Sequence, residues 1–368
     1  MFKRKDKKKK IKKVSKKKIT FYVVVFLLLV VFYTGIYHLK FKSMPEGTSF
    51  EGEERFVSEE SVEFLYDLTY LNESGERAYE QNIFDRIFSV IDSAEEFILI
   101  DMFLWGSSDN SYRNLSDELT KHLVDKKKEN PEIKITVITD GYNTLYHSYD
   151  EPHFRELEDS EINVVYTNMD RMRDSNPFYS SFWRVFVSGF GLPKSYCDNS
   201  LISYGGRGTC IRSVLKALNY KVNHRKIVVA DSGEKVVSMI TSANSHDGSS
   251  AHSNIAFYVE EKIWKDIYNS ENSVAEFSNS FIDYDFGNVY ETNSSDVSIQ
   301  FLTEGKIKEN LIEDIDFTIE GDSIEVMMFY LSDRGVINSL IEASARGVEI
   351  KFILDPNKDA FGSKKNGV

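Results

Sequence analysis

A histidine and a lysine stand two positions apart at the start of a strongly apolar segment. His224, Arg225 and Lys226 are followed by four apolar residues at 227–230 and then by Asp231. The apolar run predicts a buried strand. Because side chains alternate between the two faces of a strand, we expect His224 and Lys226 on one face and Arg225 on the other. An imidazole and an ammonium group then lie side by side at the open end of this strand.

This combination suits a phosphate ester. A histidine can act as a nucleophile or a proton donor near neutral pH, and a nearby lysine neutralises phosphoryl oxygens. A second predicted strand at 235–240 is followed by Ser242 and Asn244, whose side chains can donate hydrogen bonds to the same anion. A surface hairpin with a charged tip is the alternative, and the apolar strand inside the motif argues against it.

The pattern His224-x-Lys226-x4-Asp231, followed by Ser242-x-Asn244 and by Asn254, resembles the HKD signature of the phospholipase D superfamily. The resemblance covers most of the chain after about residue 76 and is to the cardiolipin synthase type. It implies a phosphohistidine intermediate and a reaction that uses no metal and no cofactor. The candidate catalytic residues are His224, Lys226 and Asp231, and the candidate phosphate-binding residues are Ser242, Asn244 and Asn254. Of these, we expect Asp231 to orient the site rather than to transfer a proton.

Other metal- and nucleotide-binding patterns are weak. His246 and His252 flank Asn244, but no carboxylate or cysteine completes a usual ligand spacing around them. His246 is better explained as a hydrogen-bonding loop residue. The glycine-rich residues 205–209 lack the Gly-Lys-Ser/Thr arrangement of a phosphate-binding loop.

Charge is distributed very unevenly along the 368 residues. Residues 1–18 contain twelve Lys or Arg and one Asp, a net charge of +11, so the chain total of −13 becomes −24 over residues 19–368. Such an acidic body repels phosphate backbones, and we expect no nucleic-acid partner.

An apolar segment follows the basic block. Residues 19–37 carry no charge and, as a helix, would be ~28 Å long, which is enough to cross a bilayer. We predict a transmembrane helix over residues 19–39. A cleaved signal peptide is the alternative, but the run is longer than the usual apolar region and no small-x-small site follows it. The positive-inside rule places residues 1–18 in the cytoplasm and the body outside, in a single-pass protein of the cell membrane.

The two cysteines agree with an outward location. Cys197 and Cys210 are the only cysteines, and they lie in a loop rich in Gly, Ser and Asn. In an oxidising compartment they can close a small disulfide ring. Two free thiols remain the alternative, and a zinc site lacks two further ligands.

Two parts of the chain share one order of elements. Residues 80–140 and 304–356 each read as helix, strand, helix and a strand that ends in Asp. This repeat predicts a mixed α/β sheet flanked by helices, in the two-lobed form that resemblance to phospholipase D implies. We assign a first lobe to 76–290 and an incomplete second lobe to 291–368. Residues 40–75 are predicted to be a stalk, with a short helix at 62–71.

Residues 176–191 contain six aromatic side chains. One interpretation is an amphipathic core helix. The other is an apolar lip that enters the membrane interface near the active site, with Arg171 and Arg184 close to lipid phosphates.

Transfer through a phosphohistidine needs a second proton donor opposite the nucleophile. The chain contains one His-x-Lys-x4-Asp pattern, and its second lobe stops at Val368. Three explanations account for the missing second motif: the chain is a fragment of a longer two-motif protein, it forms a homodimer that shares one site, or it is inactive.

The expected function is that of a membrane-anchored enzyme that transfers a phosphatidyl group from a membrane phospholipid to an alcohol or to water. An HKD-type nuclease and a non-catalytic lipid- or partner-binding surface protein are the alternatives.

Overall fold

The computed structural model describes residues 15–108, 111–197, 202–204, 206–260, 263–284 and 297–355. The chain forms two compact units. The first consists of Met1–Pro45, Val62–Glu260 and Val274–Tyr290, and the second of Glu46–Ser61, Glu261–Ser273 and Glu291–Val368. Most of the basic N-terminal segment (residues 1–14) and the last part of the predicted second lobe (residues 356–368) lie outside the described residues.

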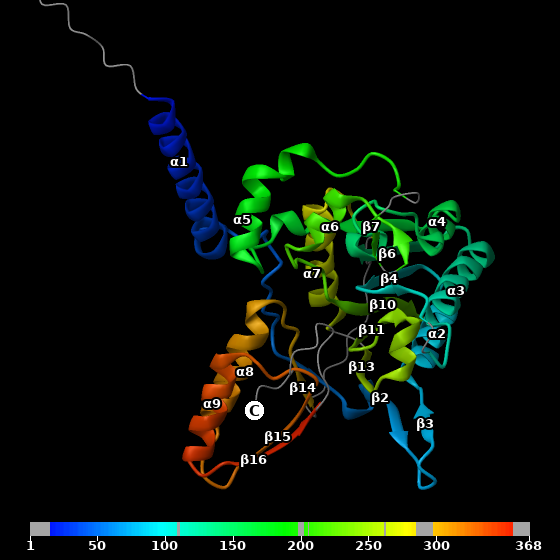
Figure 1. Ribbon diagram of the computed structural model, residues 1–368. Coiled ribbons are helices and arrows are strands. Elements are labelled where there is room, and N and C mark those ends of the chain that lie inside the picture. Colours follow the sequence, from blue (N-terminus) through cyan, green and yellow to red (C-terminus); the bar gives the residue numbers. More distant parts are fainter. Residues whose placement is uncertain are drawn as a thin grey trace, which may run out of the picture. The chain divides into compact units, whose positions relative to one another are not determined.

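The first unit is built on an eight-stranded sheet in the order β3-β2-β13-β11-β10-β4-β6-β7 (Figure 1). In chain order the strands are β2 (Val62–Leu71), β3 (Arg77–Glu80), β4 (Phe97–Met102), β6 (Lys134–Asp140), β7 (Asn163–Thr167), β10 (Lys226–Ser232), β11 (Lys235–Thr241) and β13 (Asn254–Glu260). Strands β4, β6 and β7 are parallel, whereas β10 runs antiparallel to β4 and β11. The start of β10 and the ends of β4, β6 and β11 therefore share one edge, which we call the motif edge.

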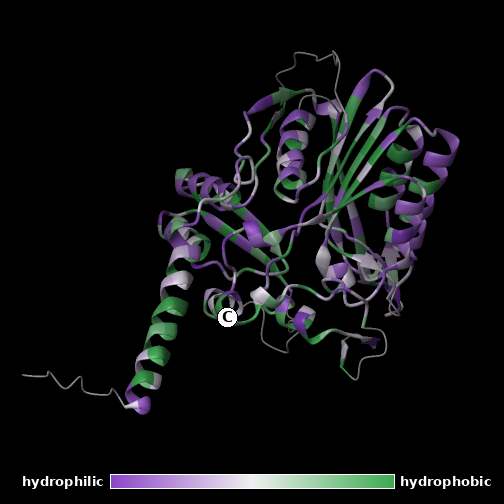
Figure 2. Ribbon diagram, turned by 90° about the horizontal axis from the view of Figure 1, so that it is seen from above, coloured by the Kyte–Doolittle hydropathy of each residue, from purple (hydrophilic) through white to green (hydrophobic). Residues whose placement is uncertain are grey.

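The central strands β4 and β10 carry consecutive apolar residues and are buried along almost their whole length, so both faces of these two strands are covered. Helices α2 (Ile83–Ser93), α3 (Leu115–Glu129) and α4 (Pro152–Asp159) contribute to one buried apolar cluster on one face. In β10 and β11, Val228, Ala230, Val237 and Met239 point into this cluster. Figure 2 shows mainly hydrophobic strands beside helices with hydrophilic outer sides. The predicted mixed α/β sheet flanked by helices is confirmed.

Further short elements complete the described part of this unit. They are β5 (Trp105–Gly106), α5 (Pro177–Phe186), β8 (Ser203–Tyr204), β9 (Arg207–Gly208), α6 (Ile211–Ala217) and β12 (Ser245–His246). Strands β5 and β12 pair in parallel just beyond the motif edge. Helix α7 (Trp264–Phe277) follows the sheet along the chain.

The short helix predicted at 62–71 is wrong, because this segment is strand β2. Large apolar residues recur at every second position from 64 to 70, and Leu65 and Asp67 are buried where Phe64 and Tyr66 are exposed. That period of two is the pattern of a strand with one covered face. The strand pairs with β13 over six residue pairs.

The predicted apolar helix is present as α1 (Lys16–Ile36), which continues through a π-helical turn (Tyr37–Phe41). Among the described residues it is the one helix that is long and apolar enough to cross a membrane, by length and composition alone.

The second unit repeats part of the first. Helix α8 (Gly305–Phe317), strand β15 (Ser323–Met328), helix α9 (Arg334–Ala345) and strand β16 (Glu349–Leu354) follow in the order of α2, β4, α3 and β6. Strands β15 and β16 are parallel, as are β4 and β6. A small apolar core of this unit includes Ile315, Leu340 and Val348. Strands β1 (Arg55–Val57) and β14 (Val297–Ile299) form a separate antiparallel pair.

Asp231 joins two strands at the end of the sheet opposite the motif edge. Its buried carboxylate accepts hydrogen bonds from the backbone N–H groups of Glu95 (2.8 Å), Glu96 (3.0 Å) and Phe97 (2.8 Å). These donors precede and begin β4. The carboxylate therefore fixes the start of β4 against the end of β10.

We predict that Asp231→Ala lowers the free energy of unfolding by about 3 kcal/mol, because it leaves buried backbone donors without an acceptor. Chemical unfolding of the detergent-solubilised chain measures this loss. Glu234→Ala, at the exposed tip of the same hairpin, is the matched control and should change stability by less than about 0.5 kcal/mol. Equal stability of the two variants would contradict the structural role of Asp231.

Candidate functional site

His224 and Lys226 meet at the motif edge. Lys226 is the first residue of β10 and is 5% exposed. Its ammonium nitrogen lies 3.3 Å from Nδ1 of His224 and donates a hydrogen bond of 2.8 Å to the backbone oxygen of His224. The structure thus brings together the two residues that the alternation of the strand predicts on one face.

Phe103, directly after β4, forms a wall beside both groups. Lys226 pairs with Met102 in the β10–β4 register, so the next residue of the β4 chain lies beside the residues that precede β10. The Phe103 ring centroid is 4.7 Å from that of His224 and 5.5 Å from the ammonium nitrogen of Lys226. The ring screens the pair from water and favours the cation through its π face.

Two buried carboxylates fix the chain just before His224. The Asn223 side chain donates to Asp101 over 2.6 Å, and the Asn223 backbone N–H donates to Asp140 over 2.7 Å. Asp101 and Asp140 are fully buried at the ends of β4 and β6. Two adjacent strands therefore hold the residue preceding the candidate nucleophile, so the position of His224 depends on the sheet rather than on a free loop.

Sequence reasoning missed this support. Asp101 and Asp140 were recognisable as carboxylates at the carboxyl ends of apolar strands, and Asn223 as a polar neighbour of His224. Nothing in the spacing shows that the three meet, because the contact depends on strand order in the sheet.

Burial sets the protonation of the pair. Burial, and then the charge of Lys226, lower the pKa of His224 to about 4. Burial also lowers the pKa of Lys226 to about 8, against the raising effect of Asp101. At pH 7 the imidazole is therefore neutral, with a lone pair for nucleophilic attack, while the ammonium group remains mostly charged.

The candidate phosphate-binding residues also gather at the motif edge. The Ser242 hydroxyl donates to the side-chain oxygen of Asn254 (3.1 Å) and accepts from the N–H of Ile255 (3.0 Å). The side-chain oxygen of Asn244 accepts from the N–H of Leu104 (3.2 Å). This contact uses the acceptor of Asn244, not its donor, and it ties the loop after β11 to the end of β4.

Asp231 does not join this group. It lies five residues along β10 from Lys226, a separation of ~16 Å in an extended strand, and it binds the backbone at the start of β4. The expectation that Asp231 orients the site finds no direct contact with His224, because a strand carries the two ends of the motif to opposite ends of the sheet.

The loop after Asn244 is held by its own polar groups. Nδ1 of His246 accepts from the N–H of Gly248 (3.1 Å), which is a local loop contact. The buried Asp247 carboxylate accepts from the N–H (3.0 Å) and the hydroxyl (2.6 Å) of Ser116 at the start of α3. Within the described ranges, no group of three or more His, Cys, Asp or Glu side chains is placed to hold a metal ion.

The two cysteines are joined. A disulfide connects Cys197 and Cys210, whose Cα atoms are 5.4 Å apart. Ser148 receives both ends of this ring, since its backbone oxygen accepts from the N–H of Cys197 (2.7 Å) and its hydroxyl accepts from the N–H of Cys210 (3.1 Å).

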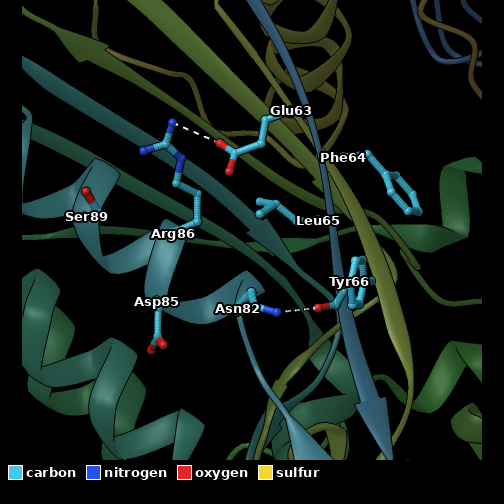
Figure 3. A pocket seen from close by; sticks show the side chains of 8 residues that line it. All are labelled: Glu63, Phe64, Leu65, Tyr66, Asn82, Asp85, Arg86 and Ser89. Carbon is cyan, nitrogen blue, oxygen red and sulfur yellow. Dashed lines mark hydrogen bonds and ion pairs between the residues drawn. The ribbon is translucent and has the colours of Figure 1, made fainter.

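A surface hollow of about 470 Å³ lies elsewhere, between β2 and α2 (Figure 3). Arg86 of α2 points toward Glu63 of β2, with 3.1 Å between the charged groups, and its guanidinium lies 3.9 Å from the ring centroid of Tyr258. Strands β13 and β11 separate β2 from β10 in the sheet. None of the motif residues lines this hollow. Two of its charged side chains, Arg86 and Glu63, already form an ion pair with each other.

We predict that Lys226→Met raises the pKa of His224, because it removes the neighbouring positive charge. Proton NMR titration of the imidazole C–H signals measures this shift. Lys235→Met at the far end of β11 is the control and should leave the pKa of His224 unchanged. An unchanged pKa in the Lys226 variant would contradict the contact.

The lowered pKa of His224 also predicts how stability depends on pH. Between pH 6.5 and pH 4 the unfolded chain binds a proton at His224 that the folded chain does not bind, so stability falls as the pH falls through this range. His224→Gln should reduce this part of the decline. A wild-type decline that is unaltered in the variant would show that other groups cause it.

The comparisons with known proteins agree with a phospholipase D-like chain. Residues 311–367 match the family model described as "Cardiolipin synthase, PLD-like domain". No curated protein matches the chain significantly. The matched residues lie in the second unit and not in the His224 motif.

Solved structures resemble the chain at low identity. Nuc from Salmonella typhimurium, a phospholipase D family member, has 14% identity and a TM-score of 0.32 over 63% of this chain and 99% of its own. The phosphatidylserine synthase of Haemophilus influenzae has 9% identity and a TM-score of 0.47 over 83% of this chain. The polyphosphate kinase of Porphyromonas gingivalis has 14% identity and a TM-score of 0.40, also over 83% of this chain.

The chain spans 64% of the synthase and 40% of the kinase. From residues outside the His224 motif, the match at 311–367 confirms the resemblance of this chain to the phospholipase D superfamily.

Proposed function

We propose that this protein is a membrane-anchored phosphodiesterase of the phospholipase D type that acts on glycerophospholipids. The observation that carries the proposal is a sheet-held His224 whose Nδ1 lies 3.3 Å from the ammonium nitrogen of Lys226, in surroundings whose burial lowers the pKa of the imidazole to about 4. A neutral imidazole is a nucleophile, and the ammonium group supplies the positive charge that the phosphoryl oxygens need. The match to a cardiolipin synthase PLD-like domain supports transfer of a phosphatidyl group to an alcohol as the finer assignment.

The proposed reaction has two steps. Because Nδ1 of His224 faces Lys226, Nε2 is the nitrogen that we propose as nucleophile. Nε2 forms a bond to phosphorus while the bond from phosphorus to the headgroup oxygen breaks, and the departing alkoxide takes a proton. An alcohol or water then loses a proton and attacks phosphorus, and the bond from phosphorus to nitrogen breaks.

The other candidate residues take supporting roles in this proposal. Lys226 and the amide donor of Asn244 hold the phosphoryl oxygens, and Ser242 and Asn254 shape the rim of the site. Asp231 acts at a distance by fixing β10 against β4. The reaction as written needs neither a metal nor a cofactor.

The proton for the departing alkoxide has to come from a group opposite His224. A second copy of the chain is one source in this proposal. An open apolar surface beside Ser242 is suited to such a copy, and its exposed residues are Phe64, Tyr66, Ile240, Ile255 and Phe257 on β2, β11 and β13.

The location follows the charge pattern. We propose that α1 anchors the protein once in the cell membrane, with residues 1–18 in the cytoplasm and the sheet outside. The disulfide between Cys197 and Cys210 suits an oxidising, extracytoplasmic compartment. We keep 19–39 as the anchor and 291–368 as part of a second lobe, and the first lobe expected at 76–290 takes in β2 (Val62–Leu71) as well.

We predict that His224→Ala lowers lipid turnover on the order of 10³-fold or more, since the group that bonds to phosphorus is lost. The full chain is reconstituted in phosphatidylglycerol vesicles with an added alcohol, and the transfer product and phosphatidic acid are measured separately. His122→Gln on α3, where the imidazole contacts Asp92, is the matched control and should keep its turnover.

Three outcomes would contradict this proposal. Full turnover in His224→Ala would remove the assigned nucleophile. Cleavage of DNA without any turnover of lipid would favour the HKD-type nuclease, although the net charge of −24 over residues 19–368 repels nucleic acid. Lipid binding without turnover by the wild type, unaltered in His224→Ala, would favour a binding protein.

A further inference from the structure

Helix α5 leaves most of its aromatic side chains exposed. Phe178 is 89% exposed and Phe190, just after the helix, is 73% exposed, and Phe182 and Phe186 are also exposed. The buried side of α5 consists of Ser180, Ser181 and Trp183. An amphipathic core helix would bury the larger apolar side, so the core interpretation does not fit. We call Phe178, Phe182, Phe186 and Phe190 the aromatic face.

The buried side of α5 packs against α1. A Cβ atom on Gly35 would lie 2.6 Å from the hydroxyl of Ser181, so the two helices touch closely at this glycine. Arg184 donates a hydrogen bond to the backbone oxygen of Thr34 (3.4 Å). Figure 1 shows α5 beside the C-terminal end of α1.

This contact sets the depth of α5 relative to a membrane. The charge-free run of α1 covers residues 19–37, and at 1.5 Å per residue Thr34 lies ~5 Å before its end. If α1 spans the bilayer, α5 therefore lies where the hydrocarbon core meets the headgroups. Aromatic side chains favour that depth.

Buried ion pairs connect this junction to the motif. The Asp174 carboxylate lies 2.8 Å from Arg184 of α5 and 2.8 Å from Lys221. Lys221 stands three residues before His224. Lys42, just after α1, donates to the backbone oxygens of Asp170 (2.6 Å) and Met172 (3.2 Å). Residues 170–174 thus hold together the end of α1, helix α5 and the residues just before His224.

Residues 170–174 belong to the connection through which the chain leaves the sheet at the motif edge. Strand β7 ends at Thr167, on the edge where β4 and β6 end and β10 begins. The chain then passes through the turn Met169–Arg171 into α5. Arg171 and Arg173 in this connection are exposed cations.

We propose that the aromatic face docks on the outer leaflet of the bilayer that α1 spans, with Arg171 and Arg173 beside the lipid phosphates. This docking holds the motif edge toward that bilayer, so His224 takes its phospholipid from the membrane that anchors the protein. The inference rests on the proposed anchoring and names the membrane surface as the partner of α5.

Fluorescence quenching tests the docking without any need for activity. Phe178→Trp and Phe190→Trp are made in the full chain, which is reconstituted in phosphatidylglycerol and phosphatidylcholine vesicles containing lipids brominated near the headgroup. The signal of the three native tryptophans is subtracted. We expect at least twofold stronger quenching at both positions than at the control Phe281→Trp.

Phe281 is a matched control because it is 66% exposed but lies at the opposite edge of the sheet. Its backbone oxygen accepts from the side chain of Asn163, the first residue of β7 (3.1 Å). Quenching at residues 178 and 190 no stronger than at 281 would overturn the proposal. Because both substitutions replace exposed aromatic residues with another aromatic residue, the fold is preserved.

A second measurement separates docking from chemistry. Phe178→Ser with Phe190→Ser should reduce turnover of vesicle lipid at least tenfold while leaving turnover of lipid dispersed in detergent unchanged. Equal loss in both assays would overturn the orienting role. Quenching as expected in a chain without lipid turnover would keep the docking and refute the proposed function.

Discussion

The pairing of β10 with β4 is the constraint on which the site depends. It places Lys226 against Met102, Phe103 beside His224, and Asp101 within reach of Asn223. Each of these contacts joins residues more than a hundred positions apart, and none of them forms unless the two strands align in this register. Asp231 holds the opposite end of the same pair of strands. A shift by one residue would turn His224 and Lys226 to the other face and separate them from Phe103.

Burial of the Lys226 ammonium group beside an imidazole costs free energy, and this cost appears as a lowered pKa of both groups. Lys226 loses hydration at the motif edge, which lowers its pKa, and its charge helps to keep His224 neutral. Asp101 acts in the opposite direction on Lys226, so the ammonium group keeps its proton near neutral pH. Asp101 offsets only part of the cost of burying Lys226, and a phosphate anion placed there would supply further negative charge. In the proposed reaction, this environment favours both binding of the phosphate anion and attack by the imidazole nitrogen.

Several elements of the fold and the pairing of His224 with Lys226 were predictable, because short sequence patterns determine them. The apolar run at 227–230 with its alternation gave β10 and the shared face of His224 and Lys226, and the repeated order of elements gave α8 to β16. Strand β2 was missed because its acidic, polar surroundings were interpreted as a stalk, although large apolar residues stand at every second position from 64 to 70. The partners of Asp231 and Asn223 were not predictable, since backbone donors and strand order leave no signal in spacing. A short motif shows which residues matter more readily than it shows where each of them lies.

The aromatic residues at 176–191 show why composition alone could not decide between a core helix and a membrane lip. Both interpretations need an apolar helix, and the two differ only in which side of it the fold covers. Here the covered side is small and faces α1, while the aromatic face is open. Exposure of a Phe side chain to water forgoes about 1.5–3 kcal/mol relative to burial, and four such residues beside an apolar helix make a large unmet contribution. In the proposed docking, a bilayer surface supplies that burial without a protein partner, and the ion pairs of Asp174 with Arg184 and Lys221 connect α5 to the segment before His224.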